Sequence, residues 1–277
     1  MSHVRRAFGL RRVGHGGTLD PAVTGVLPIA VGSATRLLPY LPGDKAYHGT
    51  LQLGVRTDSD DLEGEVLERR PVPSLSRADL LQVLERFRGH VLQRPPQISA
   101  VHVNGERAYR RVRRGESLDL PARSVSFHSL ELLGWDGQLG RLNLAVRCSA
   151  GTYIRALARD IGELLGCGGC LASLRRTAAL GFEEAQALPL ERLASPPLPP
   201  LLDPLPALAA LPRRLLSETE VLAWRCGRGL EASEELAAQL QLQDPVVVLL
   251  PSGALAGIAR YAGADQLQPR LVLEARG

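Results

Sequence analysis

The sequence has 277 residues, of which 45% are hydrophobic and 22% are charged. This composition is typical of a globular chain with one large or two smaller domains, and it excludes a disordered or fibrous protein. No uncharged apolar stretch is long enough to span a membrane, and the N-terminus is too basic and polar for a secretory signal, so we expect a cytoplasmic protein. The net charge of +4 is concentrated in residues 1–120, where 18 Lys and Arg stand against 13 Asp and Glu. A basic N-terminal half suits nucleic acid without requiring it.

The N-terminal part of the chain alternates between strand and helix signals. The apolar run Val26–Val31 predicts a buried strand, and Ser33–Leu41 predicts a short helix. Partial alternation predicts a strand over Tyr47–Val55. A capping-box pattern at Ser76 predicts the start of a helix that we expect to end at Gly89.

The same alternation continues through the middle of the chain. Ser99–Val103 predicts a strand, and Ala108–Arg114 predicts a short basic helix. Ser124–Leu133 and Arg141–Cys148 predict paired antiparallel strands. An apolar stripe predicts a helix over residues 154–165. Antiparallel pairs mixed with helices favour the α+β class over a doubly wound sheet.

A proline-rich segment divides the chain. Eight prolines fall between residues 189 and 212, and such a segment cannot continue a helix or supply a central strand. We therefore expect a body over residues 1–190, a connector over 191–212 and a small module over 213–277. The elements that the pattern predicts in that module are a helix near Ser217–Arg225 and strands at Val246–Leu250, Leu255–Tyr261 and Arg270–Glu274.

Two cysteines have a spacing that occurs in metal and redox sites. Cys167-Gly-Gly-Cys170 could be half of a zinc site or a redox pair. The sequence contains no second motif of this kind to complete a zinc site, and the strand-to-helix setting of a thioredoxin-like motif is missing. We therefore expect ordinary buried thiols and no metal.

One carboxylate stands out near the N-terminus. The run Gly14-His15-Gly16-Gly17-Thr18-Leu19-Asp20-Pro21 follows four arginines, and Asp20 is the only acid before Asp44. Cationic surroundings favour the charged form of an acid, and glycines let the backbone approach a bulky ligand closely. Those features suit a carboxylate nucleophile that acts on a polyanion, although Asp-Pro is also typical of an ordinary turn.

Three further clusters combine aromatic and basic residues. Tyr47, two residues after Lys45, begins a predicted strand and could either stack on an everted base or fill the core. Arg155 lies in the first turn of a predicted helix, where the dipole favours anions, so it either meets a carboxylate or phosphate or lies on the surface. The run Gln93–Gly105 with the basic segment Tyr109–Arg114 is either a phosphate-contact surface or a solvated charged face. The sequence contains no P-loop, dinucleotide-binding or zinc-hydrolase signature.

In this order, the clusters resemble the bacterial tRNA pseudouridine synthase B (TruB) family over nearly the whole chain. The matching runs are Gly14–Pro21, Ala22–Pro28, Asp44–Tyr47, Thr57–Asp60 with Gly64, Gln93–Ala100, Gly151–Arg155 and Leu174–Thr177. The resemblance implies a pseudouridine-synthase body, with a mixed and largely antiparallel sheet flanked by helices, and a small PUA-like RNA-binding β module at the C-terminus. It also implies that uridine 55 in the tRNA T-loop is converted to pseudouridine without a cofactor.

The resemblance also assigns roles to individual positions. It makes Asp20 the nucleophile and Arg155 the partner that keeps Asp20 ionised and oriented. Tyr47 would stack on the flipped base and assist proton removal. The substrate-binding positions that the resemblance implies are His15, Lys45, Tyr153 and Leu174. The expected partner is the T-arm of tRNA, with no membrane, no obligate protein partner and a monomeric enzyme.

Three departures from the family pattern are visible. The family normally begins with a strand and a Lys-Pro motif ahead of the position of Met1, so we expect either an earlier start or a sheet that lacks one edge. Gly16 stands where Thr is usual, which should loosen the loop. His102 stands where Lys is common, which should weaken one phosphate contact.

Two other functions stay open at this point. A catalytically impaired protein that binds or folds tRNA would keep the basic surface and the C-terminal module but would form no pseudouridine. A guide-RNA-dependent relative of the eukaryotic or archaeal type would carry longer flanking regions and a fuller C-terminal domain than residues 213–277, and we consider it the weaker alternative.

Overall fold

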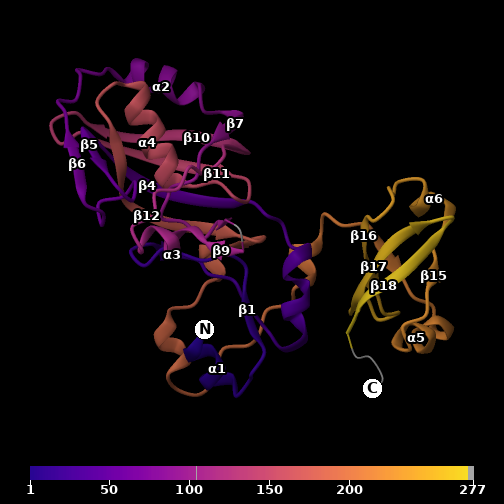
Figure 1. Cartoon of the computed structure of the whole chain (residues 1–277). Helices are drawn as coiled ribbons and strands as arrows, with labels where there is room; N and C mark the ends of the chain where they lie inside the picture. The colour runs from indigo at the N-terminus through magenta and orange to yellow at the C-terminus, as the bar shows by residue number, and fades with distance from the viewer. Residues whose placement is uncertain (104, 274–277) are drawn as a thin grey trace.

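A seven-stranded sheet forms the centre of the body (Figure 1). Its strands run in the order β13-β12-β4-β11-β10-β7, and β2 pairs with β12 off this path. All neighbours are antiparallel except the parallel pair β2–β12. The computed structural model, which describes residues 1–103 and 105–273, therefore confirms the α+β class with a mixed, largely antiparallel sheet. The strands are β2 (Thr24–Gly25), β4 (Lys45–Leu53), β7 (Gly89–Gln93), β10 (Arg123–Asp136), β11 (Arg141–Cys148), β12 (Gly169–Ala179) and β13 (Phe182–Glu183).

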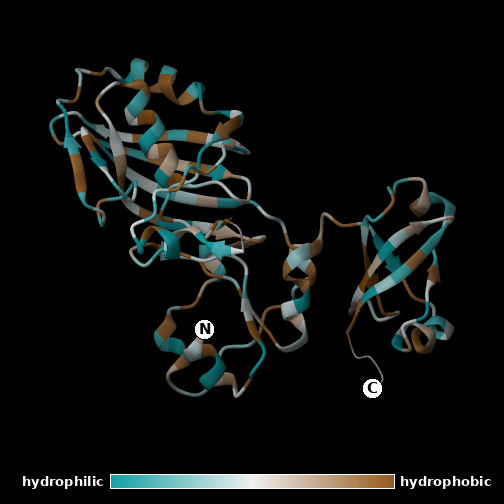
Figure 2. Cartoon of the chain, in the orientation of Figure 1, coloured by the Kyte–Doolittle hydropathy of each residue, from teal (hydrophilic) through white to brown (hydrophobic). Residues whose placement is uncertain are grey.

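Two helices pack with the sheet in one hydrophobic core. Helix α4 (Ile154–Leu164) and helix α2 (Arg77–Glu85) share this core with strands β4, β10 and β11, and both lie along the sheet in Figure 1. Figure 2 shows that each helix carries hydrophobic and hydrophilic residues, as a helix with one buried face requires. Ser76 caps α2 through the predicted capping box. The helix ends at Glu85 and not at Gly89, which has a φ of +76° and begins β7.

Three predicted elements differ from the structure. Within the run Val26–Val31 only β3 (Ile29–Val31) is a strand, because Pro28 interrupts the run and has no N–H to donate. It pairs with β1 (Val13–His15) in a separate two-stranded sheet and is only half-buried. The expected helix over Ser33–Leu41 is a 3₁₀ helix, η1 (Gly32–Tyr40). The strand expected over Ser99–Val103 shrinks to β8 (His102–Val103).

The remaining elements of the body are short and lie around the sheet. They are α1 (Ser2–Phe8), β5 (Val55–Thr57), β6 (Val66–Arg69), β9 (Glu106–Arg107), α3 (Ala108–Val112) and η2 (Glu184–Gln186). Two turns of 3₁₀ helix, η3 (Leu190–Leu193) and η4 (Leu205–Leu208), lie in the proline-rich segment.

A second sheet of five strands forms the C-terminal module, in the order β14-β16-β17-β18-β15. A helix is present where the sequence predicts one near Ser217–Arg225, and Ser217 caps this helix, α5, with a capping box. The last strand was predicted over Arg270–Glu274, but in the structure this strand already begins at Gln266. The predicted end, Glu274, lies outside the described residues. The elements of the module are β14 (Arg213–Leu215), α5 (Glu218–Arg225), β15 (Leu230–Glu231), α6 (Glu234–Ala237), β16 (Pro245–Leu249), β17 (Leu255–Gly263) and β18 (Gln266–Val272).

Helix η1 joins the body to the C-terminal module, and Figure 1 shows it as the violet coil between them. Leu37 of η1 is 1% exposed and shares a hydrophobic cluster with Leu208, Val247 and Ile258. Arg36 donates a hydrogen bond from Nη2 to the carbonyl of Val272 at 3.0 Å. The two units are therefore in direct contact through the segment that follows β3. In the described part of the chain, no helix is both long and apolar enough to cross a membrane.

Candidate active site

Asp20 lies on the loop between β1 and β2, and half of its side chain is exposed. Its Oδ2 atom is 2.9 Å from Nε of Arg155, whose side chain is only 7% exposed. The ion pair joins two segments that are far apart in the sequence. A charge-assisted hydrogen bond from a buried guanidinium fixes the direction of the carboxylate, while the exposed half of the Asp20 side chain stays accessible to a ligand.

Arg155 is itself held by groups from two other loops. Its Nη1 donates to the carbonyl of Ser59 at 2.8 Å and lies 3.5 Å from Oδ2 of Asp61, and its Nη2 donates to the carbonyl of Ile98 at 3.0 Å. The guanidinium is therefore shared between two carboxylates, Asp20 and Asp61. Sequence reasoning did not single out Asp61, although an acidic run at residues 58–61 in a basic half of the chain was an available signal.

The start of α4 is fixed by a buried amide. Gln93 is 3% exposed, accepts a hydrogen bond from the backbone N–H of Tyr153 at 2.9 Å and donates one to the carbonyl of Tyr153 at 3.1 Å. Tyr153 is the N-cap residue, directly before the first helical residue of α4. These two hydrogen bonds fix the position of the first turn of α4, which carries Arg155.

A second ion pair supports the loop that carries Asp61. Asp60 has a φ of +62° and lies 2.8 Å from Nη1 of Arg159, one turn along α4 from Arg155. Burial raises the pKa of Asp60 to about 6, and the attraction of Arg159 opposes that rise. Arg159 also pairs with Asp160 and donates to the carbonyl of Arg94. This network ties three segments together beside the Asp20–Arg155 pair.

Tyr47 is 8% exposed at the start of β4. Burial raises the pKa of its phenol to about 12, Cys148 adds to that rise, and the guanidinium of Arg176 opposes it. Asp20 also contributes to the rise, which places its carboxylate within electrostatic reach of the ring. Tyr47 is therefore a neutral phenol at neutral pH. Its side chain is part of the core cluster of the body, and stacking on an everted base stays a prediction.

Lys45 lies beside the loop that carries Asp20. A Cβ placed on Gly17 would be 3.3 Å from Cε of Lys45. Burial and the nearby Arg176 lower the pKa of the Lys45 ammonium. Lys45 therefore reaches the glycine-rich loop, and its substrate-binding role stays a prediction.

The glycine-rich loop is packed more tightly than the sequence suggests. Nδ1 of His15 accepts a hydrogen bond from the N–H of Gly17 at 3.3 Å. A Cβ on Gly16 would lie 1.7 Å from Cδ1 of Leu180, whose side chain is buried. Leu180 fills the space that a larger side chain at residue 16 would occupy, and the expectation that Gly16 loosens the loop stays a prediction.

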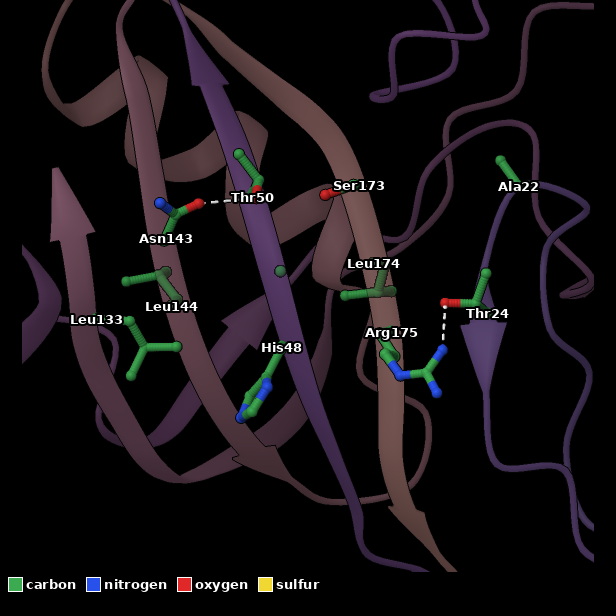
Figure 3. A pocket seen from close by; sticks show the side chains of 11 residues that line it. Ala22, Thr24, His48, Thr50, Leu133, Asn143, Leu144, Ser173, Leu174 and Arg175 are labelled. Atoms are coloured by element: carbon green, nitrogen blue, oxygen red, sulfur yellow. Dashed lines mark hydrogen bonds between the residues drawn. The ribbon is translucent and has the colours of Figure 1, made fainter. Parts of the chain in front are cut away.

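Leu174 lies on β12 next to β4, with Cδ1 at 3.2 Å from the position of a Cβ on Gly49. It also lines a pocket of about 360 Å³ on the sheet, which Figure 3 shows between the strands. The other residues of this pocket are Ala22, Thr24, His48, Gly49, Thr50, Leu133, Asn143, Leu144, Ser173 and Arg175. Asp20, Tyr47 and Arg155 are not among its lining residues, so this pocket is separate from the ion pair.

The basic segment after Gln93–Gly105 forms α3. Two of its arginines are already paired, Arg111 with Glu116 and Arg114 with both Glu106 and Glu116. Arg110 and Arg113 lie over the ring of Tyr109. Part of the positive charge of the segment is therefore neutralised by its own carboxylates. His102, which is exposed, lies on the adjacent β8. Asn104, within the run Gln93–Gly105, lies outside the described residues.

The Cys167 and Cys170 thiols are both buried, and burial raises the pKa of each. They lie at the end of α4 and the start of β12 and do not contact the Asp20–Arg155 pair in any hydrogen bond of the described chain. Their observed setting is that of ordinary core thiols.

With its mixed, largely antiparallel sheet, the chain has a fold of the Cbf5/TruB type. The solved structures that it resembles include the archaeal box H/ACA sRNP Nop10–Cbf5 complex (TM-score 0.68, 22% identity, 98% of this chain and 80% of that one) and a Cbf5–Nop10–Gar1 complex (TM-score 0.67, 22% identity, 98% and 79%). At 22% identity, the similarity to these structures establishes the fold of the chain.

The sequence comparisons identify the family. The TruB family pseudouridylate synthase N-terminal domain matches residues 5–154, and the tRNA pseudouridylate synthase B C-terminal domain matches residues 155–197. Relatives described as tRNA pseudouridine synthase B include those of Synechococcus sp. (strain WH7803), 58% identical, and Prochlorococcus marinus (strain MIT 9313), 50% identical, each over 100% of this chain and 93% of the relative. The chain belongs to the TruB family of pseudouridylate synthases.

Proposed function

We propose that the protein converts uridine 55 in the T-loop of tRNA to pseudouridine, with Asp20 as the nucleophile. The observation that carries the proposal is the half-exposed Asp20 carboxylate, 2.9 Å from the buried guanidinium of Arg155 and within electrostatic reach of Tyr47. An ionised carboxylate held in one direction is the arrangement that nucleophilic catalysis needs. The relatives named tRNA pseudouridine synthase B support tRNA as the substrate.

The reaction balances without a co-reactant. The carboxylate of Asp20 acts on the flipped nucleotide while the bond between C1′ and N1 breaks, the base turns, and C1′ joins C5. The proton leaves C5, and N1 ends as N–H, so substrate and product are isomers. The proposal therefore includes no redox or group-transfer cofactor.

In this proposal Tyr47 stacks on the everted base. Its phenol is neutral at neutral pH because its pKa is about 12, so it would have to lose its own proton before it could accept one from C5. Stacking needs only the ring of Tyr47, which lies on β4 opposite Arg176 of β12. His15, Lys45, Tyr153 and Leu174 are proposed contacts to the nucleotide or its neighbours.

The test is pseudouridine formation on a transcript of the tRNA T-arm. The wild-type protein should form pseudouridine at position 55, and Asp20→Asn should form none, because an amide cannot act as the nucleophile. The matched control is Asp136→Asn, since Asp136 caps a distant hairpin turn through hydrogen bonds that an Asn oxygen can also accept. Equal product from wild type and Asp20→Asn would contradict the mechanism, and product at another uridine would contradict the assigned position.

We also propose that the protein acts as a monomer in the cytoplasm, without a guide RNA or an obligate partner protein. We propose that residues 213–277 act as a module that contacts tRNA outside the T-loop. We also propose that the catalytic body ends at residue 190 and that residues 191–212 connect it to this module. The alternative, a tRNA-binding or RNA-folding protein, predicts salt-dependent tRNA binding with no isomerised product. The same transcript assay separates the two.

A further inference from the structure

Arg176 is a charged side chain with almost no exposure to solvent. It lies on β12 directly opposite Tyr47 of β4 and is 1% exposed. Its Nε donates a hydrogen bond to the carbonyl of Val26 at 2.7 Å, and its Nη2 donates to the carbonyl of Gly17 at 3.2 Å. Its own carbonyl accepts the N–H of Val26 at 2.8 Å.

These three hydrogen bonds hold both ends of one loop. Gly17 precedes Asp20 by three positions and Val26 follows it by six, so residue 176 ties the segment that carries Asp20 to β12 at its beginning and at its end. At the second end, the loop backbone lies very close to the backbone of β12. A Cβ on Gly25 would lie 2.1 Å from the carbonyl oxygen of Arg176. Gly25 also has a φ of +100°, which favours glycine.

The charge of Arg176 is not explained by an ion pair. Among the described residues, no carboxylate lies within salt-bridge distance of its guanidinium. A buried charge without a counterion is costly, and an apolar side chain would avoid that cost. Besides the two carbonyls, the guanidinium interacts electrostatically with the phenol of Tyr47 and the ammonium of Lys45.

We propose that Arg176 is a positioning residue that holds the Asp20 loop over Tyr47, so that the carboxylate and the aromatic ring reach the same nucleotide. The planar guanidinium can bind two carbonyls at once, which a lysine ammonium at the same position cannot do with the same geometry. The inference rests on the proposed function, because it concerns the placement of the nucleophile assigned there. The role proposed for Arg176 differs from that of Arg155. Arg176 holds the two ends of the loop, whereas Arg155 binds the carboxylate of Asp20.

The experiment compares Arg176→Lys with wild type by two measurements. The single-turnover rate of pseudouridine formation should fall by about 10–100-fold, since a displacement of about 1 Å costs a reaction rate of this order. The dissociation constant of the T-arm transcript should stay within about threefold, which corresponds to about 0.6 kcal/mol. The control is Arg88→Lys, because Arg88 also donates to a buried carbonyl, that of Leu130, far from the loop.

A second measurement does not depend on activity. Hydrogen exchange of residues 17–26 should be faster in Arg176→Lys than in wild type and unchanged in Arg88→Lys. If the wild type forms no pseudouridine, the proposed function fails, and this exchange measurement alone decides whether Arg176 holds the loop.

If Arg176→Lys does not fold, as judged by circular dichroism, Gly25→Ala takes its place. That substitution pushes the loop away from β12 and leaves the guanidinium intact. A wild-type rate in whichever variant is folded, an equal loss of rate and affinity, or unchanged exchange in the loop would each overturn the proposal.

Discussion

At the scale of single residues, the position of Arg155 is explained by its partners and not by its helix. A guanidinium in the first turn of a helix faces the positive end of the helix dipole, which is unfavourable. Arg155 is nevertheless 7% exposed, with Asp20 at 2.9 Å and Asp61 at 3.5 Å. Removing one partner of a buried charge pair leaves the other charge uncompensated. The three residues therefore act as a unit.

Substitution of Arg155 should affect the chemical step more than binding. In Arg155→Ala, Asp20 loses the group that orients it, so we expect turnover to fall by about 100-fold or more, while T-arm affinity changes little. Single-turnover rates and filter binding on the same transcript measure the two effects. Arg159→Ala is the comparison, because Arg159 pairs with Asp60 and Asp160 and not with Asp20. Comparable losses of rate and affinity in Arg155→Ala would mean that Arg155 mainly binds a phosphate.

At the scale of elements, the contact between α4 and β12 sets the spacing between Arg155 and Arg176. Gly162 of α4 lies so close to the strand that a Cβ there would be 2.1 Å from the N atom of Gly169 and 2.5 Å from the carbonyl oxygen of Gly168. The obstacle is backbone, which cannot rotate away as a side chain can. A side chain at residue 162 must therefore move the helix.

The substitution Gly162→Ala should destabilise the protein despite its favourable helix propensity. Alanine gains about 1 kcal/mol over glycine within a helix, whereas overpacking typically costs about 1–3 kcal/mol. Because the added Cβ meets backbone atoms, we expect an overpacking cost near the upper end of that range. We expect a net loss of stability in urea unfolding and a lower rate, because Arg155 moves with α4. Glu163→Ala, on the exposed side of the same helix, should change stability by less than about 0.5 kcal/mol. Unchanged unfolding of Gly162→Ala would contradict the close contact.

The elements that the sequence predicted well are those with an unbroken pattern. The stripe of α4, the capping box of α2 and the alternation in β10 and β11 follow directly from local residues. The long strand β12 was not predicted, although it lies at the centre of the fold. Its register shifts between Leu171 and Ser173 and again between Arg176 and Ala178, which breaks the period-two alternation.

The site could be predicted only in part, for a related reason. Motifs identified Asp20, Tyr47 and Arg155 one by one, and the structure joins Asp20 and Arg155 in an ion pair. The roles of Asp61 and Arg176 depend on contacts between segments far apart in the sequence, which spacing alone does not reveal. A buried arginine on an unrecognised strand gives no local signal.

At the scale of the whole molecule, η1 connects the C-terminal module to the glycine-rich loop. One side of η1 contributes Leu37 to the cluster with Leu208, Val247 and Ile258. Another side packs on β1, where a Cβ on Gly14 would be 3.1 Å from Cδ1 of Leu38 and 3.4 Å from Cγ2 of Thr35. The C-terminal module therefore packs, through η1, against strand β1, which leads into the Asp20 loop.

Loss of this contact should slow the reaction as well as weaken the fold. Leu37→Ala removes buried methyl groups and should cost about 2–5 kcal/mol, and we expect a several-fold lower single-turnover rate at a temperature where the variant is still folded. Leu230→Ala is the matched control, since Leu230 is 5% exposed in the separate core of the module. It should lower stability without changing the rate per folded molecule. Equal rates in the two variants would mean that the module acts only through tRNA contacts, because a mechanical link through η1 predicts a difference between them.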